Sequence, residues 1–375
     1  MHVEVIESWE ALEPHRAVWQ DLAGDHPFLQ WSWLRRWWDA FGEHRNLLVL
    51  RITAEETTDR DDPKSTLAFA PFFREHNWVQ GNVIRFLGSG RVCSDYLRIL
   101  CRDDDQAAAA KAIGDWLRDH ASHHQPPIRW NLLELDGVVG NEPTVETMVG
   151  ELEQRGALLD DTTSLHVWRV ELPESWEAFA KEKLKSQYRK KFRKLSKKWL
   201  ETGQAKLCRA ETPDQVQTML DELIALHERR RTSIGEEGCF GDPRFVRWMH
   251  NICQDLFDSG HLRLSALDAD ERRVAMAVGF EFGGVLYHYQ TGIETDALAM
   301  SPGFVLNIAI IQAAIQRGLH AIDFLRGDEH YKSMFGGVPS DCRRLRIVPP
   351  NTASLLRHRL WRAGGSVRKL MKGWR

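Results

Sequence analysis

Four side chains between residues 288 and 332 are of the types that acid–base chemistry and anion stabilisation require: His288, Asp323, Arg326 and Lys332. A histidine whose pKa is close to neutral can act as a general base, and a carboxylate can orient a nucleophile or take its proton. Arginine and lysine can stabilise an oxyanion or bind an anionic substrate. We interpret these four as candidate catalytic residues, with a satisfied core histidine and surface ion pairs as the open alternatives.

A strand–helix–strand unit is expected to position these side chains. The stretch VLYHYQTGI at 285–293 predicts a strand, and FVLNIAIIQAAIQRG at 304–318 predicts a helix. AIDFLRG at 321–327 predicts a second strand that ends in a loop. Glycines in that loop would let the backbone approach a ligand closely.

Alternation of side chains divides the first strand between two faces. It predicts that His288 and Gln290 share one side, while Tyr287, Tyr289 and Thr291 share the other. A base on this strand would therefore lie on the same face as Gln290.

The turn that opens the predicted helix has the composition of an anion site. Proline is well suited to a first turn, and the unpaired N–H groups of a helix start attract negative charge. We expect Ser301, Pro302, Gly303 and Phe304, with Gln290 of the strand, to bind the anionic part of a cofactor-like ligand. An ordinary strand–helix–strand unit without a ligand is the alternative.

Composition narrows the class of protein. A chain of 375 residues is long for one core and suggests two domains. With a formal net charge of -3, the chain as a whole is not a strongly basic nucleic-acid binder, although local basic patches are allowed. The six cysteines are scattered without a C-x-x-C pair, so we expect reduced thiols, no disulfide framework and no metal site.

The two ends of the chain bear on localisation. The first residues are charged and lack the apolar run of a signal peptide, and no stretch reaches the 18 or more apolar residues of a membrane span, so we expect a cytoplasmic protein. Residues 351–375 form a basic amphipathic tail without an acidic residue. Such a tail can lie on the anionic inner face of a membrane. It can also dock on its own protein, and both alternatives stay open.

The order of predicted elements is similar in the two halves of the chain. Each half contains a hairpin, a further strand, a helix and another strand. This pattern predicts an α/β (α+β) fold of two tandem modules, each a mixed twisted sheet flanked by helices. We place the first module at 1–160, the second at 161–350 and the tail at 351–375.

The segment 175–199 combines an apolar stripe with many basic residues. Apolar and aromatic residues recur mainly at three- and four-residue steps, which predicts one long helix. Its other positions carry ten lysines and arginines against two acids, Glu177 and Glu182. Like charges at these spacings repel one another. The basic face is therefore either a solvated surface or a binding surface for a phosphate-rich ligand such as CoA, a nucleotide sugar or RNA.

A second helix, predicted from Pro213 to about Arg231, ends in consecutive arginines. His227 and Arg230 stand three residues apart and therefore share a face. The arginines either favour the helix dipole alone or bind a carboxylate or phosphate of a substrate. We carry His227 and Arg230 as candidate substrate-binding residues.

Taken together, these motifs resemble a known family. Their order resembles the CelD-like acetyltransferases of the GNAT superfamily, named for cellulose and exopolysaccharide biosynthesis, over roughly residues 5–350. The ending YKSMFGG is also similar to the Lys-x-x-Phe-Gly signature of Fem-type aminoacyltransferases, which are tandem GNAT folds. The motifs are SDYL at 94–97, KSQYRKKFRKL at 185–195, LHERRR at 226–231, YHYQTGI at 287–293, SPG at 301–303 and IDFLRGDEHYK at 322–332.

The resemblance implies an acyltransferase. An acetyl or acyl group would pass from acyl-CoA to an amine or hydroxyl of a small molecule, a sugar, or an envelope or exopolysaccharide precursor. The pantetheine arm would enter between splayed strands, with the pyrophosphate at the helix start. Lys332 is placed at the reaction centre by its match to the Fem-type lysine, and Tyr331 beside it is a candidate substrate-binding residue. Asp95 and Tyr96 of the first module are candidates for acceptor binding.

One departure from ordinary GNAT sequences leaves the donor open. The phosphate-binding turn usually reads Gln/Arg-x-x-Gly-x-Gly/Ala, whereas here only Ser301-Pro302-Gly303 occupies its place. Fewer glycines leave fewer backbone N–H groups to surround a pyrophosphate. Aminoacyl-tRNA is therefore an alternative donor, and a non-catalytic scaffold of a polysaccharide synthesis complex is a third possibility.

Overall fold

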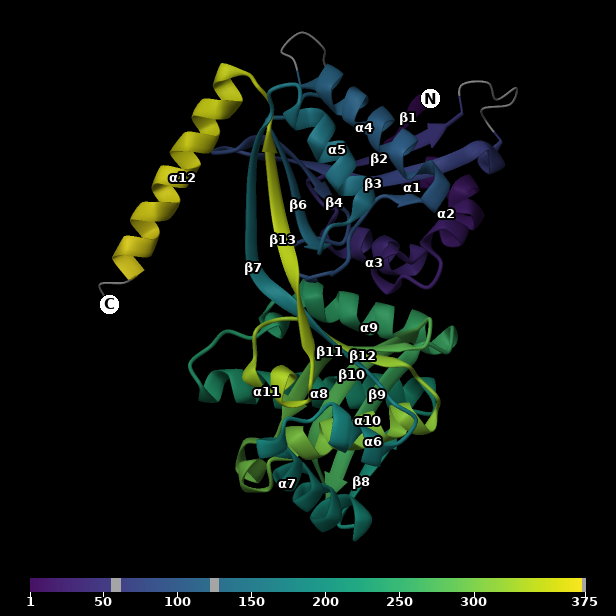
Figure 1. Cartoon of the computed structure of the whole chain (residues 1–375), viewed down its shortest axis with the longest axis vertical. Coiled ribbons are helices and arrows are strands. Elements are labelled where there is room, and N and C mark those ends of the chain that lie inside the picture. The colour runs from purple at the N-terminus through teal and green to yellow at the C-terminus, as the bar shows by residue number, and fades with distance from the viewer. Residues whose placement is uncertain (55–61, 122–127, 373–375) are drawn as a thin grey trace. The chain divides into compact units, whose positions relative to one another are not determined.

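A computed structural model describes residues 1–54, 62–121 and 128–372 of the chain (Figure 1). The chain divides into two compact units. Unit 1 contains Met1–Gly24, Phe28–Ser164 and Asp341–Arg375, and unit 2 contains Asp25–Pro27 and Leu165–Ser340. Apart from the short stretch Asp25–Pro27, the chain passes from one unit to the other within two long strands, β7 (Leu158–Glu171) and β13 (Val338–Val348).

Unit 1 contains a mixed sheet with the strand order β1-β2-β3-β4-β6-β13, and β5 lies beside β3. Neighbouring strands are antiparallel except for β4 and β6, which are parallel. Helices α4 and α5 pack on each other, and α4 also contacts β1, β2 and β3. The elements are β1 His2–Ile6, α1 Trp9–Leu12, α2 Arg16–Ala23, α3 Trp31–Phe41, β2 Asn46–Thr53, β3 Thr66–Asn77, β4 Gly81–Phe86, β5 Leu100–Cys101, α4 Gln106–His120, β6 Leu132–Val139, α5 Pro143–Glu153 and α12 Thr352–Lys372.

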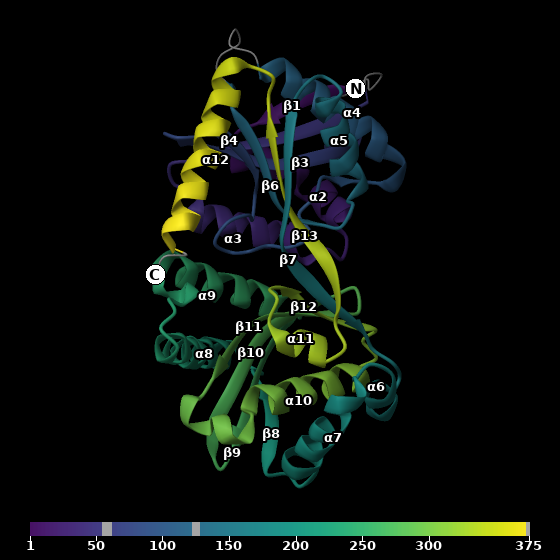
Figure 2. The ribbon, with the colours of Figure 1, turned by 60° about the vertical axis from the view of Figure 1, so that its left-hand side comes forward.

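In unit 2 the strand order in the sheet is β7-β12-β11-β10-β9-β8. Only β11 and β12 are parallel neighbours. Figure 2 shows α8 and α9 on one side of this sheet and α10 on the other. The elements are α6 Trp176–Glu182, α7 Ser186–Leu195, a π-helix at Ser196–Glu201, β8 Ala205–Arg209, α8 Pro213–Ser233, α9 Pro243–Asp258, β9 Leu262–Ala269, β10 Arg272–Phe282, β11 Val285–Ile293, α10 Pro302–Gln316, β12 Ala321–Arg326 and α11 His330–Met334.

Each unit therefore has a mixed sheet flanked by helices, which is the fold class that the sequence predicts. The compact units differ from the expected modules at 25–27, which belong to unit 2, and at 161–164 and 341–350, which belong to unit 1. The reason at 341–350 is strand pairing, since β13 pairs with β6 from Cys342 to Ile347. The described part of the chain contains no helix that is both long and apolar enough to cross a bilayer.

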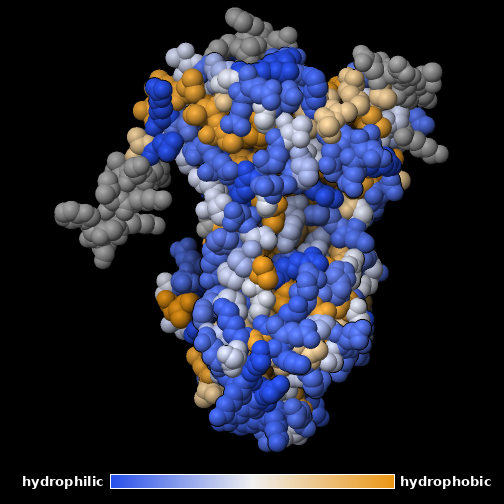
Figure 3. Space-filling model, in the orientation of Figure 1, coloured by the Kyte–Doolittle hydropathy of each residue, from blue (hydrophilic) through white to orange (hydrophobic). Residues whose placement is uncertain are grey.

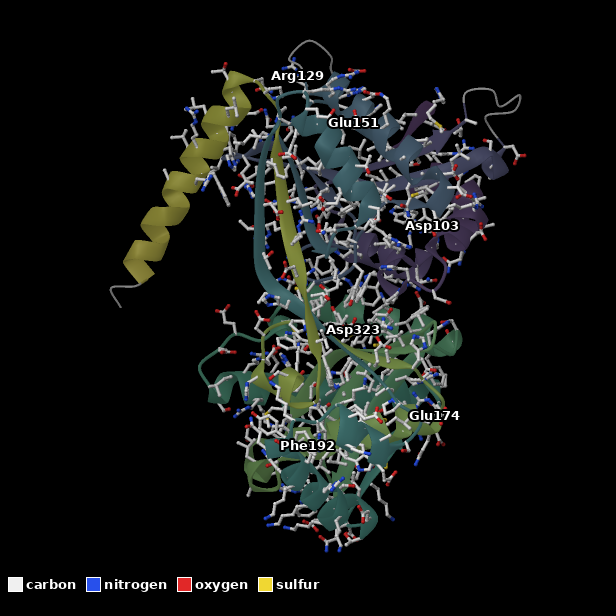
Figure 4. All side chains as sticks on the ribbon, viewed as in Figure 1. Asp103, Arg129, Glu151, Glu174, Phe192 and Asp323 are labelled. Atoms are coloured by element: carbon white, nitrogen blue, oxygen red, sulfur yellow. The ribbon has the colours of Figure 1, made fainter. Side chains whose placement is uncertain are left out.

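The prediction of one long helix over 175–199 is wrong. The segment forms α6 and α7 with a break at residues 183–185, and α7 continues into the π-helix. The break accommodates the glycine-rich loop after α11, because a Cβ atom on Gly336 would lie 2.5 Å from the carbonyl oxygen of Lys183. The predicted apolar stripe is confirmed, since Phe179, Leu184 and Phe192 are buried in the core of unit 2. Phe192 is labelled in Figure 4.

We expect Gly336→Ala to destabilise the protein more than a matched glycine substitution does. Gly336 has φ +84°, and its missing Cβ faces the Lys183 backbone. Gly203 has φ +74° with no atom within 4 Å of its missing Cβ, so Gly203→Ala carries the conformational cost without the clash. In urea unfolding, Gly336→Ala should lose at least about 1 kcal/mol more than Gly203→Ala. Equal losses would show that this close approach does not constrain the fold.

Candidate functional site

Strands β11 and β12 are paired over only part of their length. Their parallel register joins Val285 to Ala321, Leu286 to Ile322 and Tyr287 to Asp323. Beyond this point β11 continues along β10 to Ile293, while β12 stays with β7. The two strands therefore part after the Tyr287–Asp323 pair. This is the separation of strands that the family resemblance implies.

A buried lysine holds the turn that leads β12 away. Leu325 has φ +57°, which is uncommon for a residue with a branched side chain, and Gly327 has φ +123°. The Nζ atom of Lys332 donates to the carbonyl oxygens of Leu325, Arg326 and Gly327 at 3.0, 2.9 and 3.0 Å. It also lies 2.9 Å from a carboxylate oxygen of Glu329. The lysine is 2% exposed, so these contacts are made largely out of water.

These contacts assign Lys332 a different role from the expected one. An ammonium group has three N–H donors, and three carbonyls already accept from this one. A direct contact with a reacting acyl group would require it to leave the turn. We therefore describe Lys332 as a positioning residue. Arg326 contributes its carbonyl oxygen to the same arrangement.

A β-bulge in β11 overturns the predicted alternation. Gln290 pairs with Val278 and His288 pairs with Gly279, so Tyr289 is an extra residue between them. One extra residue reverses the sequence of faces beyond it. Thr291 is consequently on the same side as His288 and not on the side of Tyr289.

The bulge also moves Gln290 away from its expected place. Gly292, two residues further along the strand, lies against α8, since a Cβ on it would be 2.7 Å from the carbonyl oxygen of Leu223. Residues two apart in a strand share a face, so Gln290 faces α8. The expectation that Gln290 helps to bind the donor on the α10 side is wrong for this reason.

A pocket of about 300 Å³ lies where β11 has left β12. Its lining combines the end of β11, the start of α10 and Tyr331 of α11. Four residues that the sequence selected for donor binding are in this lining, and ligand binding by them stays a prediction. The lining residues are Thr291, Ile293, Leu298, Ser301, Pro302, Gly303, Phe304, Asn307 and Tyr331.

The start of α10 offers few backbone donors to this pocket. Ser301 precedes the helix in the left-handed region, with φ 57° and ψ 54°. Pro302 has no N–H group, and the N–H of Phe304 donates to the Ser301 carbonyl at 3.0 Å. Among Pro302, Gly303 and Phe304, only Gly303 therefore has an N–H group that is not bonded to the Ser301 carbonyl. A Cβ at Gly303 would lie 2.8 Å from Ile293 Cδ1, so the helix start packs closely on the end of β11.

Positive charge lies beside the pocket. The ammonium of Lys191 on α7 is 4.0 Å from the ring centroid of Phe304, whose residue lines the pocket. The same helix exposes Lys190, Arg193 and Lys194. The basic surface predicted for this segment is thus exposed next to the start of α10, where it could attract the anionic part of a donor.

The backbone of β11 provides polar groups along the same gap. The N–H of Glu294 donates to the carbonyl oxygen of Val274 on β10 at 3.0 Å. In an antiparallel pair, successive residues direct their backbone groups alternately toward and away from the partner strand. Thr291 and Ile293 therefore direct their N–H and C=O groups away from β10, toward the side that β12 leaves.

Two titratable side chains lie on the α10 side of β11. His288 is buried, and burial together with the Lys332 ammonium lowers its pKa to about 4. The imidazole is therefore neutral and a weak base near pH 7, which argues against the expected general-base role. Tyr331 lines the pocket, and burial raises the pKa of its phenol, so the hydroxyl keeps its proton at neutral pH.

Other candidate residues lie on the opposite, α8–α9 side of the sheet. Asp323 is fully buried, accepts a hydrogen bond from the Leu325 N–H at 2.7 Å and interacts with Arg169 and Tyr287 (Figure 4). Burial, with the Asp323 charge, raises the pKa of Tyr287 to about 12. On α8, burial lowers the pKa of His227, whose ring packs on Phe240 at 5.0 Å.

The remaining candidates have mixed outcomes. Arg230 of α8 is half-buried, whereas its neighbours Arg229 and Arg231 form ion pairs with glutamates. Asp95 belongs to unit 1, where it is fully buried, and Cys342 Sγ lies 3.8 Å from its carboxylate. Tyr96 follows in the left-handed region at φ 58°. The acceptor-binding role of these residues stays a prediction.

Sequence reasoning missed part of the pocket. Asn307 lines it, and its side chain also interacts with the buried imidazole of His288. The signal was present in the sequence, since Asn307 is the one polar residue in FVLNIAII at 304–311. Ile293 and Leu298 gave no comparable signal, because apolar residues there are equally consistent with core packing.

Comparison with known proteins supports this description. Residues 186–333 match the family model described as acetyltransferase (GNAT) domain. The fold is similar to a crystal structure titled FemX, with TM-score 0.61 and 10% identity over 95% of this chain and 99% of that one. It is also similar to a conserved protein of unknown function from Bacteroides thetaiotaomicron VPI-5482, with TM-score 0.54 and 13% identity over 92% of this chain and 100% of that one.

At these identities the structural likeness concerns the fold alone. No curated protein sequence matched the chain. The family model that matches describes the GNAT acetyltransferase domain and does not specify a CelD-like group. The assignment to CelD-like proteins therefore stays a prediction.

Replacing Lys332 with methionine should destabilise the protein strongly. Met has a similar length but leaves three carbonyl oxygens without their donor, and at least one of them is buried. We expect a loss of about 3 kcal/mol in unfolding free energy. Lys194→Met, at an exposed position of α7, should change it by less than about 0.5 kcal/mol. Similar values for the two variants would contradict the proposed role of the ammonium.

His288 should make stability depend on pH. The unfolded imidazole takes up a proton below its ordinary pKa of 6.5, whereas the folded one stays neutral until about 4. The unfolded state therefore binds more protons in this range, and stability falls as pH decreases from 6.5 to 4. The stability difference between wild type and His288→Gln should shift by up to about 3 kcal/mol across that range. A difference that is constant with pH would show that the burial of His288 has no such effect.

Proposed function

We propose that the protein is an acyltransferase that moves an acetyl or other acyl group from acyl-CoA to an amine or hydroxyl. The observation that carries this proposal is the parting of β11 and β12 beyond Tyr287 and Asp323, beside a pocket at the start of α10. The match of residues 186–333 to the GNAT acetyltransferase domain supports the same activity. An extended thioester arm needs such a gap, because a fully paired sheet would have no free backbone groups there.

The residues of the pocket are suited to an acyl-CoA arm. Thr291 and Ile293 would bind the amides of an extended arm through backbone groups that face away from β10. Apolar side chains line most of the pocket and would contact its methylene groups. The Gly303 N–H and the Lys191 ammonium would interact with the phosphates.

Acyl transfer needs a proton donor for the leaving group. The acceptor nitrogen or oxygen forms a new bond to the thioester carbonyl carbon and the C–S bond breaks. The acceptor loses one proton, and the thiolate leaving group must gain one. The phenol of Tyr331 holds a proton at neutral pH and lines the pocket. We assign Tyr331 as the residue that protonates the leaving thiolate.

The acceptor would approach from the opposite face of the sheet. Asp323 and Tyr287 form the last pair before the strands part, and both belong to the α8–α9 side. The carboxylate of Asp323 would orient an amine or hydroxyl at that point, with His227 and Arg230 of α8 on the same side of the sheet. An envelope or exopolysaccharide precursor as acceptor rests on the sequence resemblance to CelD-like proteins.

An aminoacyl-tRNA donor is the second candidate. It is favoured by the start of α10, where Pro302 has no N–H and the Phe304 N–H is already used. A pyrophosphate would find few backbone donors there, whereas the exposed basic surface of α7 could bind an RNA backbone. Lys190 and Arg193 are exposed on that surface.

Calorimetry with acetyl-CoA tests the proposal. Wild type should bind it saturably, and Gly303→Glu should weaken binding at least about tenfold, because it adds bulk and negative charge to the pocket. Gln316→Glu adds the same charge at the other, exposed end of α10 and should leave binding unchanged.

The remaining outcomes separate the alternatives. No binding of acetyl-CoA, together with aminoacyl-tRNA binding that Lys190→Glu and Arg193→Glu weaken, would select the second candidate. No binding of either donor would contradict an acyltransferase and leave the scaffold interpretation.

A further inference from the structure

Helix α12 packs on unit 1 through one side. Ser354 and His358 are buried, and Leu355 packs against a small cluster that contains Val83 and Val348. The guanidinium of Arg346 lies 3.6 Å from the ring centroid of Trp361. The sequence left open whether this segment docks on its own protein, and the structure shows that its first half does.

The same helix carries exposed apolar residues on its other side. Leu356 is 56% exposed and Leu360 is 61% exposed. With 3.6 residues per turn, these positions lie roughly opposite to Ser354, His358 and Trp361. In the sequence, Ala363, Val367 and Leu370 continue the three- and four-residue spacing of the two leucines. Docking on unit 1 therefore accounts for one side of the helix and leaves Leu356 and Leu360 exposed.

The tip of the β3–β4 hairpin extends this exposed surface. Trp78 is 91% exposed and Val79 is 53% exposed. The guanidinium of Arg357 on α12 donates to the carbonyl oxygens of Trp78 and Val79 at 3.0 and 3.4 Å. Arg357 and Leu360 stand three apart and are neighbours on the helix surface. We call Trp78, Val79, Leu356 and Leu360 together the Trp78–Leu360 surface.

The charged side chains of α12 are all basic. Arg359 and Arg362 are exposed, and residues 351–375 contain no aspartate or glutamate. In the coloured part of α12, at the upper left of Figure 3, apolar and strongly hydrophilic residues lie next to each other. Exposing a tryptophan and two leucines to water is unfavourable in free energy. Apolar side chains next to arginines are suited instead to the boundary between lipid headgroups and acyl chains.

We propose that the Trp78–Leu360 surface binds the protein peripherally to an anionic phospholipid bilayer. The leucines and Val79 would enter the outer part of the acyl-chain region, and Trp78 would lie at the headgroup level. Arg359, which is three residues from Leu356 and next to it on the helix surface, would pair with lipid phosphates. Charge complementarity favours this occupant over a second copy of the chain, because two copies facing each other through this surface would bring arginines together.

Co-sedimentation of the full-length protein with vesicles tests the proposal. Vesicles of phosphatidylcholine mixed with phosphatidylglycerol should retain the protein, and vesicles of phosphatidylcholine alone should retain much less of it. The double variant Leu356→Ser/Leu360→Ser should partition at least about tenfold more weakly into the anionic vesicles. Ile234→Ser, at an exposed apolar position of unit 2, should bind like wild type.

Charge variants provide the second arm of the test. Arg359→Glu should weaken binding to anionic vesicles, whereas Arg247→Glu on α9 should not. Equal binding of Leu356→Ser/Leu360→Ser and wild type would overturn the proposal. A loss of binding only on reversing Lys190 and Arg193 would place the lipid contact on α7 and also overturn it. If the leucine variant instead converted a dimer to a monomer in solution, a second copy would be the occupant.

Discussion

The buried ammonium of Lys332 is the contact on which the geometry of the site depends. It binds three successive carbonyl oxygens at the end of β12, where Leu325 and Gly327 adopt positive φ angles. Without that cation, three carbonyls would converge on a space without a donor. The turn carries β12 away from β11, and the gap that results is the place where the pocket opens. The lysine thus acts on the site through the backbone.

The bulge at Tyr289 then decides which side chains face that gap. Thr291 and Ile293 line the pocket on the α10 side, while Tyr287 and Asp323 belong to the α8–α9 side. A donor on one face and an acceptor on the other could meet only where the strands have parted. This division separates the proton donor Tyr331 from the carboxylate of Asp323, in agreement with different roles for the two groups.

The sequence predicted the elements of the site better than their contacts. The Ser301-Pro302-Gly303 turn, the helix after it and the mixed sheet follow from proline, glycine and apolar periodicity, which act locally. The bulge did not follow, because one extra residue in β11 is defined by its register with β10, a non-local property. The break before α7 is similar, since it depends on the contact between Gly336 and Lys183. The contacts of Lys332 with three carbonyl oxygens require its ammonium group to be buried. The sequence did not predict this burial, because lysine side chains are usually exposed.

Backbone amide shifts of β11 measured by NMR on adding acetyl-CoA test the central claim most directly. If the donor lies in the gap between β11 and β12, the N–H groups of Thr291 and Ile293 should shift most along this strand. Those of Gly292 and Glu294, which point to β10, should shift less. Uniform small shifts along β11, or the largest shifts at residues of unit 1, would contradict a donor site in this gap.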